Sequence, residues 1–266
     1  MMVCMHTTYL NQKMKTIRLA NPLLTFNNAK TIKGQPLGYR TAILYLAPHK
    51  ASGVINTCEH SSKECRATCL YKSGNAILYP KVNQARVRKT KLLHAQPDLF
   101  WEVIHNEIDS LRSYCLKHYL KPAVRLNGTS DIYNASIEYL MWMNQDVDFY
   151  DYTKDFGRIK DFIQRRLPHN YSLTFSHSEA NFAQSISCLE SGVNVAVVFD
   201  VGRGKKLPAT WCGYKVVDGD VHDLRFLDTI DSIKNQKAVV IGLRAKGSAR
   251  KLKPRKLGFV QPNTDT

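Results

Sequence analysis

Short runs of apolar residues recur along the chain and alternate, from residue 123 onward, with segments of helical periodicity. Two continuous apolar runs, Val193 to Phe199 and Ala238 to Leu243, are typical of strands covered on both faces. Weaker runs predict further strands at residues 42–46, 123–126, 147–152 and 172–175. Such alternation is typical of βα units that build a parallel sheet.

The segments between these runs predict the crossover helices. After Pro97-Asp98, apolar residues recur at helical spacing as far as Cys115, which predicts an amphipathic helix with a buried stripe. A second helix is expected over residues 179–191, with Ser178 as its N-cap and Gly192 as its stop. Shorter helices are expected at residues 137–143 and 159–167.

Together these elements predict an α/β fold, either a six-unit (βα) half barrel or a doubly wound parallel sheet. The chain has no Pro/Gly/Ser-rich linker and no internal repeat, so we expect a single domain over residues 1–266. Residues 1–27 are expected to form an N-terminal arm and residues 247–266 a basic C-terminal tail.

Charge adds a preference for anionic partners. The 38 Lys and Arg outnumber the 22 Asp and Glu, which gives a formal net charge of +16. Nucleic acid or a nucleotide is the commonest partner of such a chain, although a solvated basic surface without a specific ligand is the plain alternative. The side chains that we expect to contact phosphates lie in two basic stretches: Arg86, Arg88, Lys89, Lys91, Arg203 and Lys205.

The sequence also predicts where the protein resides. No stretch approaches the roughly 20 apolar residues that cross a bilayer, and residues 1–18 lack the apolar core of a signal peptide. We therefore expect a cytoplasmic protein without a membrane partner. In that compartment the seven Cys are expected to be metal ligands or buried thiols rather than disulfides.

Three of these cysteines, Cys58, Cys65 and Cys69, stand within twelve residues in the pattern C-x6-C-x3-C. The residues between them are polar, which argues against a core segment, and clustered thiolates are what a soft metal or an iron–sulfur cluster requires. Zinc would be satisfied by the three thiols with His60 as the fourth ligand. An iron–sulfur cluster would keep one iron open to substrate or to another thiol such as Cys212.

Polar residues follow each predicted strand, at the edge where parallel α/β folds place their sites. The candidates for catalysis or pocket lining in this group are Asn127, Asp131, Asp151, Lys154 and His177. Asp131 has an alternative as the cap of the next helix, and a lone histidine such as His177 is more often structural. Asp220 belongs to an acidic cluster at residues 218–223 that suits a divalent ion or acid/base work, or is a turn with solvated acids.

The cysteine triplet after the first strand is similar in arrangement to that of the radical S-adenosylmethionine enzymes, which are half barrels. That resemblance implies a four-iron cluster with one open iron and S-adenosylmethionine as a second ligand. The usual spacing of that superfamily is C-x3-C-x2-C, and the Gly-Gly-Glu segment after its second strand is not evident here. This departure weakens the case for S-adenosylmethionine binding.

Several motifs together resemble a bacteriophage-encoded family, some of whose members are labelled replication proteins. The resemblance covers residues 28–258 and includes Asn28-Ala29-Lys30, the loop to Cys69-Leu70-Tyr71, the segment 84–90, the NGTSD run at 127–131 and the DYTK run at 151–154. It implies a protein that works in the cytoplasm of a bacterial host, with a role in DNA replication.

Two hypotheses of function follow. In the first, the chain is an enzyme with a Cys-bound iron–sulfur cluster that acts on nucleic acid or a nucleotide. In the second, it is a DNA-binding replication protein with a structural zinc, either an accessory or an initiator of the rolling-circle type. The initiator would use Tyr150 or Tyr152 beside Lys154 as its nucleophile, but the His-hydrophobe-His metal motif of such enzymes is absent from the sequence. The sequence does not define the oligomeric state.

Overall fold

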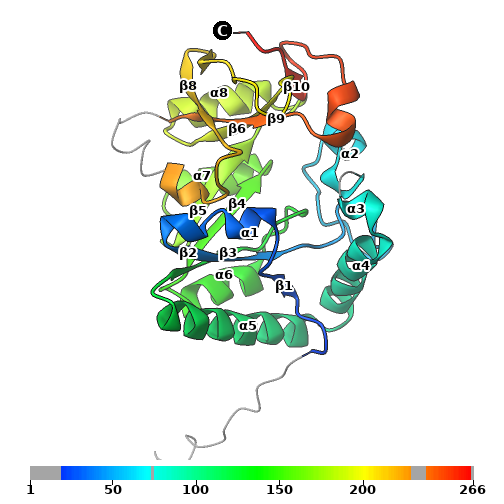
Figure 1. Cartoon of the computed structure of the whole chain (residues 1–266), viewed down its shortest axis with the longest axis vertical. Helices are drawn as coiled ribbons and strands as arrows, with labels where there is room; N and C mark the ends of the chain where they lie inside the picture. The colour runs from blue at the N-terminus through cyan, green and yellow to red at the C-terminus, as the bar shows by residue number, and fades with distance from the viewer. Residues whose placement is uncertain (1–18, 73–74, 229–237, 265–266) are drawn as a thin grey trace, which may run out of the picture.

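A ten-stranded sheet runs through the computed structural model, which describes residues 19–72, 75–228 and 238–264 (Figure 1). Its order is β1-β2-β3-β4-β5-β6-β9-β8-β7, and β10 pairs with β6. The strands are β1 (Leu24–Thr25), β2 (Tyr39–Leu44), β3 (Lys121–Arg125), β4 (Asp148–Thr153), β5 (Tyr171–Ser176), β6 (Val195–Phe199), β7 (Thr210–Trp211), β8 (Tyr214–Asp218), β9 (Val240–Arg244) and β10 (Val260–Gln261).

Neighbouring strands from β2 to β6 are parallel, as are the pairs β6–β9, β8–β9 and β6–β10. Only β1 with β2 and β7 with β8 pair in the antiparallel sense within the described ranges. The predicted α/β class is therefore confirmed as a mostly parallel sheet that does not close on itself. From β2 to β6 the order follows the chain without the reversal that a doubly wound sheet requires.

All six strands expected from apolar runs are present, at β2, β3, β4, β5, β6 and β9. Their apolar residues on one face form the main core with the helices. The short strands β1, β7, β8 and β10 were not anticipated, because two to five residues with mixed polarity carry no clear period.

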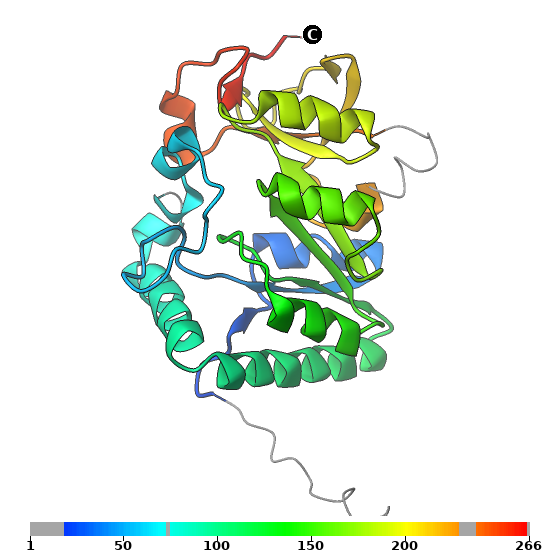
Figure 2. The same cartoon turned by 180° about the vertical axis from the view of Figure 1, so that it is seen from behind.

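Helices cover both faces of the sheet. On one face lie α5, α6, α7 and α8. Figure 2 shows α6, α7 and α8 in front of the sheet and α5 along the bottom of the view. On the other face lie α1 and a helical turn at residues 225–228 (Figure 1). Leu224, just before this turn, and Phe226 within it pack on Ala123 and Tyr150 of the sheet. The helices are α1 (Ala29–Ile32), α2 (Lys63–Ala67), α3 (Asn75–Leu78), α4 (Pro80–Ala95), α5 (Pro97–Lys117), α6 (Ala135–Met143), α7 (Phe156–Ile163) and α8 (Phe182–Glu190), with 3-10 turns η1 (Gln35–Leu37), η2 (Leu70–Lys72) and η3 (Gly247–Lys251). None of them is long and apolar enough to span a bilayer.

The helix expected over residues 179–191 begins later than predicted. Its N-cap is Asn181, not Ser178. The reason is a closed turn, because the Asn181 side chain accepts a hydrogen bond from Ser178 N at 2.6 Å and donates one to Ser176 O at 3.1 Å. The predicted stop at Gly192 is confirmed, since this residue has a φ of +81° in the left-handed region.

Segments near both ends of the described chain pair with the sheet. The expected N-terminal arm lies outside the described residues as far as residue 18, and its later part contributes β1. We call residues 247–261 the C-terminal segment. It was expected as part of a basic tail, but its η3 lies next to η2 and its β10 extends the sheet beside β6.

Gly128 follows β3 within the NGTSD run at residues 127–131. Its N–H donates to Leu44 O at 2.9 Å, and a Cβ built on it would meet Leu44 O at 2.8 Å and Ile43 Cγ2 at 2.7 Å. These distances are shorter than any normal carbon contact. The glycine is therefore required for the close packing of this turn against the end of β2.

We predict that Gly128→Ala destabilises the protein, because backbone and core atoms must move to admit the methyl group. We expect the free energy of unfolding to fall by about 1–3 kcal/mol in urea denaturation. Gly202→Ala is the matched control, since its added Cβ would lie 3.6 Å from Lys205 Cγ, an ordinary contact. Equal stability of the two variants would show that the turn has room for a side chain.

Candidate functional site at the carboxyl ends of the strands

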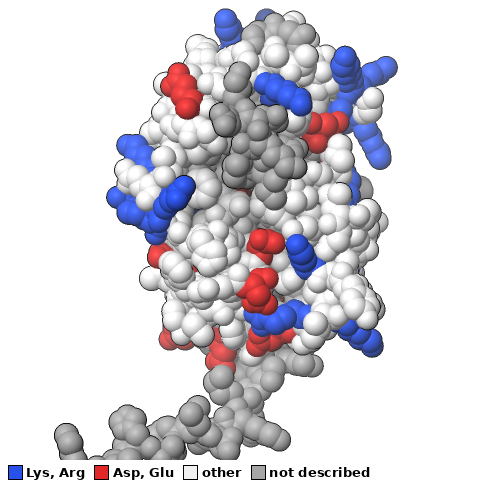
Figure 3. All heavy atoms as spheres, turned by 90° about the vertical axis from the view of Figure 1, so that its left-hand side faces the viewer, with Lys and Arg blue, Asp and Glu red and all other residues white. Residues whose placement is uncertain are grey.

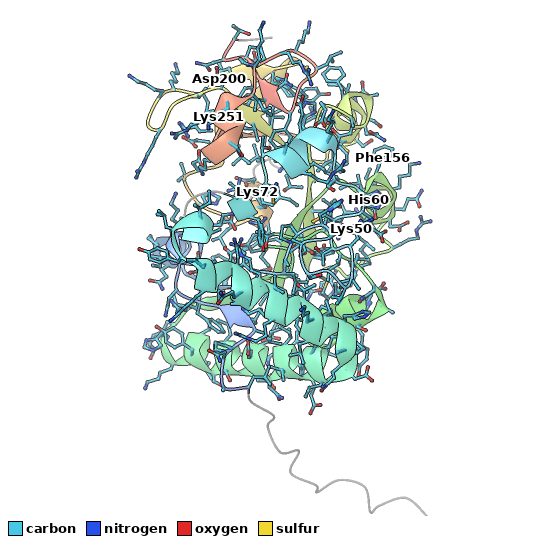
Figure 4. All side chains as sticks on the ribbon, turned by 90° about the vertical axis from the view of Figure 1, so that its right-hand side faces the viewer. Lys50, His60, Lys72, Phe156, Asp200 and Lys251 are labelled. Atoms are coloured by element: carbon cyan, nitrogen blue, oxygen red, sulfur yellow. The ribbon has the colours of Figure 1, made fainter. Side chains whose placement is uncertain are left out.

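A cavity of about 390 Å³ opens where the parallel strands end. Its walls come from the residues after β3, β4 and β5, from the loop after β2, and from the C-terminal segment. Figure 4 views the molecule from this side, where Lys50 and His60 come from the loop after β2 and Phe156 begins α7. Three of the polar residues predicted at this edge of the sheet, Asn127, Asp131 and Lys154, therefore line one cavity.

All three predicted cysteine ligands line the cavity. We call residues 57–69 the Cys loop. Cys58 Sγ lies 3.8 Å from Thr129 O, so the loop begins directly above the end of β3. Burial, with smaller contributions from Asp131 and Cys69, raises the pKa of the Cys58 thiol to about 11. Burial and the neighbouring Cys65 likewise raise the pKa of Cys69.

The Cys loop carries no ready-made coordination sphere. Within residues 19–72, 75–228 and 238–264, no three His, Cys, Asp or Glu side chains are arranged to hold one metal ion. His60, the expected fourth zinc ligand, is not among the cavity residues, and its Nε2 lies 3.7 Å from Asp155 Oδ2. Cys212, the other candidate, lies in the β7–β8 turn and does not line the cavity.

Two glutamates hold the Cys loop in place. Glu179 accepts hydrogen bonds from Ser62 Oγ and from Glu64 N, both at 2.7 Å, at the start of α2. Glu64 in turn accepts a hydrogen bond from Phe259 N at 3.0 Å and pairs with Arg255. The Cys loop is thus fastened to the start of α8 on one side and to the C-terminal segment on the other.

Asn127 and Asp151, both predicted site residues, form a buried pair at the ends of β3 and β4. Asp151 accepts hydrogen bonds from Asn127 N at 2.7 Å and from Asn127 Nδ2 at 3.0 Å, and Tyr171 donates to it at 3.2 Å. Asn127 reaches the cavity wall, whereas Asp151 is fully buried beneath it. Burial raises the pKa of Asp151 to about 6, against the opposing charge of Arg125 and the hydrogen bonds from Asn127.

Asp131 and Lys154 lie together on the cavity wall. Asp131 Oδ2 accepts a hydrogen bond from Lys154 N at 2.8 Å, and its other oxygen pairs with Arg158, whose side chain is almost fully buried. The Lys154 amine donates to Ser176 Oγ at 2.8 Å. The Lys154 amine can therefore donate to a ligand in the cavity as well as to Ser176. The Asp131 carboxylate is neutralised by Arg158.

His177 has a structural environment. Its Nδ1 lies 3.0 Å from Ser185 Oγ, and its Nε2 lies 3.2 Å from Gly258 O and 3.1 Å from Gln261 Nε2. Burial lowers the pKa of the imidazole to about 4, so the ring is neutral at physiological pH. The side chain is buried and does not line the cavity. It connects β5 to the C-terminal segment.

The predicted acidic cluster at residues 218–223 is divided between separate cations. Asp220 pairs with Lys246 at 2.6 Å and with Arg244 at 3.2 Å. Asp223 pairs instead with Arg125, at 3.0 Å. Asp220 and Asp223 both line the cavity, but each is engaged by basic side chains. They therefore position cations rather than converge on one divalent ion.

The predicted basic stretches do not form one surface. Lys89 is buried against Leu23 O, and the Arg86 guanidinium lies 5.4 Å from the Tyr45 ring centre. Arg88 and Lys91 face a shallow hollow beside α3, while Arg203 and Lys205 are exposed in the loop after β6. On the face shown in Figure 3, Lys and Arg stand in separate groups with Asp and Glu between them.

The sequence analysis assigned no role to several buried or cavity-lining cations, among them Arg158, Arg225 and Lys30. Arg158 lies on the buried side of α7 next to Ile159, and Arg225 is fully buried between Leu224 and Phe226. An arginine within an apolar stripe signals a buried partner, so this signal was present. Lys30 had no such mark beyond its place in the Asn28-Ala29-Lys30 motif.

The fold and the cavity define an α/β protein with a polar, cysteine-lined site at the carboxyl edge of a parallel sheet. The chain belongs to the Gene product 88 family, whose model matches residues 22–260. The match runs from before β1 to the first residue of β10, so it includes the Cys loop and the cavity. The expected membership of a phage-type family is confirmed to this extent. No curated protein and no solved structure matches the chain.

We predict that Arg158→Met lowers the free energy of unfolding by about 3–5 kcal/mol, because it leaves the partly buried Asp131 carboxylate without a cation. Urea denaturation measures the change. Arg166→Met is the control, since Arg166 is 61% exposed and pairs with Asp161 at the surface. That surface pair should contribute less than about 1 kcal/mol. A similar loss in both variants would contradict the role assigned to Arg158.

Proposed function

We propose that the protein is an iron–sulfur enzyme that acts on a nucleotide or on nucleic acid. One observation carries the proposal: the three thiols of the Cys loop share a single cavity with an excess of basic side chains. Six Lys or Arg line it against three Asp, namely Lys30, Lys33, Arg125, Lys154, Arg244 and Lys246 against Asp131, Asp220 and Asp223. A soft-metal donor set beside a positive wall suits a reaction on an anionic substrate.

Cys58, Cys65 and Cys69 would hold the cluster. The donor set fits, because three thiolates occupy three irons of a four-iron cluster and leave the fourth open to substrate. When bound, such a cluster supplies a redox-active iron with a free coordination position next to the bound substrate. The fastening of the loop by Glu64 and Glu179 supports this function, since ligand positions must be held for a cluster to assemble.

The other cavity residues would bind and orient the substrate. The Lys154 amine stands on the wall between β5 and the C-terminal segment and can donate to an anionic or carbonyl oxygen. Asn127 and Asp131 are held by Asp151 and Arg158, so they form a rigid polar wall. Tyr152 lines the same space with its ring under the Arg125 guanidinium, 4.6 Å away.

The rolling-circle alternative receives less support from the geometry. Tyr150 is fully buried, and its hydroxyl lies 3.3 Å from Asp223 Oδ2. Burial, together with the Asp223 charge, holds the pKa of this phenol far above its usual value. A phosphodiester could reach this oxygen only if the core opened. Tyr152 lines the cavity, but burial raises the pKa of its phenol to about 12, which disfavours the phenolate nucleophile.

We predict that protein purified without oxygen, and reconstituted with iron and sulfide, is brown and holds iron and acid-labile sulfide in equal amounts. Single Cys58→Ala, Cys65→Ala and Cys69→Ala variants should lose most of the iron, because each removes one cluster ligand. Metal and sulfide assays with an ultraviolet–visible spectrum measure the content.

Cys212→Ser is the control, since this thiol lies outside the cavity. It should keep its full iron content. A colourless protein with one zinc and no iron would replace the proposal with a structural zinc site. Iron that persists in the Cys58→Ala variant would also contradict the assignment.

A further inference from the structure

Three cations, Lys30, Arg125 and Arg225, surround the buried carboxylate of Asp223. We call these four side chains the cavity floor. Asp223 accepts hydrogen bonds from Arg125 Nη1 at 3.0 Å and from the Tyr150 hydroxyl at 3.3 Å. Burial alone would raise its pKa, but Lys30, Arg125 and Arg225 together hold it well below the usual value. Asp223 is therefore ionised, and it is the anion nearest to the Lys30 amine.

The cations of the floor outnumber the acids that pair with them. Arg225 has its own partner in Asp228, at 3.0 Å. Asp223 has Arg125 as its close partner, and Lys30 Nζ is 3.7 Å from Asp223 Oδ1, beyond hydrogen-bonding distance. Lys30 makes no side-chain hydrogen bond to any described residue. In the described part of the chain the floor thus has three cations for two carboxylates, and Lys30 shares Asp223 with Arg125.

The Lys30 side chain lines the cavity and is 39% exposed. Burial lowers the pKa of its amine to about 8; Asp223 opposes this shift, and Arg125, Lys246 and Arg225 add to it. A cation held in this way is stabilised when an anion enters beside it.

Arg125 offers a second set of donors at the same place. Its side chain is more than nine-tenths buried and lines the cavity, and its Cζ atom lies over the Tyr152 ring, 4.6 Å from the ring centre. Only Nη1 is engaged by a described residue, and the Nε group is buried without a partner. Two cationic donors of different shape, a point ammonium and a planar fork, thus meet at the floor.

The size and charge of this site limit the ligand. A cavity of about 390 Å³ is within the range for small molecules and is too small for a duplex. A phosphate monoester is a dianion near neutral pH and offers several acceptor oxygens to donors on different sides. We propose that Lys30 and Arg125 form a subsite for the phosphate group of a mononucleotide-sized substrate. This inference rests on the function proposed above and names its substrate class.

Isothermal titration of the full chain with adenosine monophosphate, adenosine and inorganic phosphate, at constant salt, tests the subsite. We expect Lys30→Met to weaken adenosine monophosphate binding at least tenfold and to leave adenosine binding unchanged. Lys117→Met is the control, since it removes the same charge at an exposed position at the end of α5. Thermal denaturation of each variant verifies that it is folded.

The pH dependence gives a second readout. Between pH 7 and 9 the phosphate monoester stays a dianion, because its second pKa is about 6. The Lys30 amine loses its proton as pH rises through about 8, so affinity should fall by up to tenfold per pH unit above that value. The charged groups facing it are Asp223, Arg125, Lys246 and Arg225. The pKa of Asp223 is lowered and those of Arg125 and Arg225 are raised, so these three keep their charge in this range. Lys30→Arg should bind with nearly constant affinity over the same range.

The outcomes separate the two proposals. Equal binding of adenosine monophosphate by wild type and Lys30→Met, equal binding of adenosine and its monophosphate, or a fall with pH that persists in Lys30→Arg would each overturn the subsite. Binding of inorganic phosphate that depends on Lys30, without nucleoside discrimination, would support the subsite and assign it to phosphate alone. The titrations are run before and after reconstitution. A chain that takes up no iron on reconstitution, yet binds adenosine monophosphate through Lys30, would overturn only the iron–sulfur proposal.

Discussion

The pairing of Arg158 with Asp131 is the interaction on which the cavity depends. From the first turn of α7, the Arg158 guanidinium donates to Thr153 Oγ1 at the end of β4 and to Ile132 O in the turn after β3. Asp131 in turn donates its N–H to Thr57 O at 2.7 Å, one residue before Cys58. One buried cation therefore joins the ends of two strands to the start of the Cys loop. Without it, the partly buried Asp131 carboxylate would lose its ion-pair partner at the cavity wall.

The cavity is roofed by segments that are distant in sequence. The Cys loop follows β2, and the C-terminal segment comes last in the described chain, yet Glu64 joins them through Arg255 and Phe259 N. In Figures 1 and 2, α2 and η3 lie side by side at the same edge of the sheet. The C-terminal segment itself packs on β6 through an apolar cluster that includes Ala249, Val260 and Val198. This packing fixes the segment on the sheet, and Glu64 then fixes the Cys loop to the segment.

Apolar periodicity predicted the sheet well, because a strand buried on both faces must be apolar along its length. The runs at residues 193–199 and 238–243 became β6 and β9 with little change in bounds. The long helix α4 was not anticipated, since its residues 80–95 are polar and basic, and little of it is buried. From their charge alone, its basic side chains were expected to contact phosphates together. In the structure Lys89 is buried and Arg86 packs against Tyr45, so these two do not share an exposed surface with Arg88 and Lys91.

For the candidate site, sequence could place residues at the correct edge but not state which of them face the cavity. Neighbouring positions on a strand point to opposite faces, so a one-residue difference decides whether a side chain lines the cavity or the helix-facing core. Asp151 points toward Tyr171 and the main core, whereas Tyr152 lines the cavity. Lys30 illustrates the other limit, because its partners Asp223 and Arg125 are far away in the sequence. Only the fold brings them together.

The distribution of positive charge bears on the size of the substrate. A protein that binds a duplex presents cations along an exposed surface at the spacing of the phosphates. Here the basic residues of segment 86–91 face different directions, and Lys and Arg on the face in Figure 3 are interspersed with acids. The cavity, by contrast, encloses six cations against three carboxylates. Of these, Arg244 and Lys246 pair with Asp218 and Asp220, and Arg125 pairs with Asp223. Lys30, Lys33 and Lys154 then remain without a carboxylate within hydrogen-bonding distance among the described residues. The excess positive charge of the cavity therefore faces inward, toward a ligand small enough to enter it.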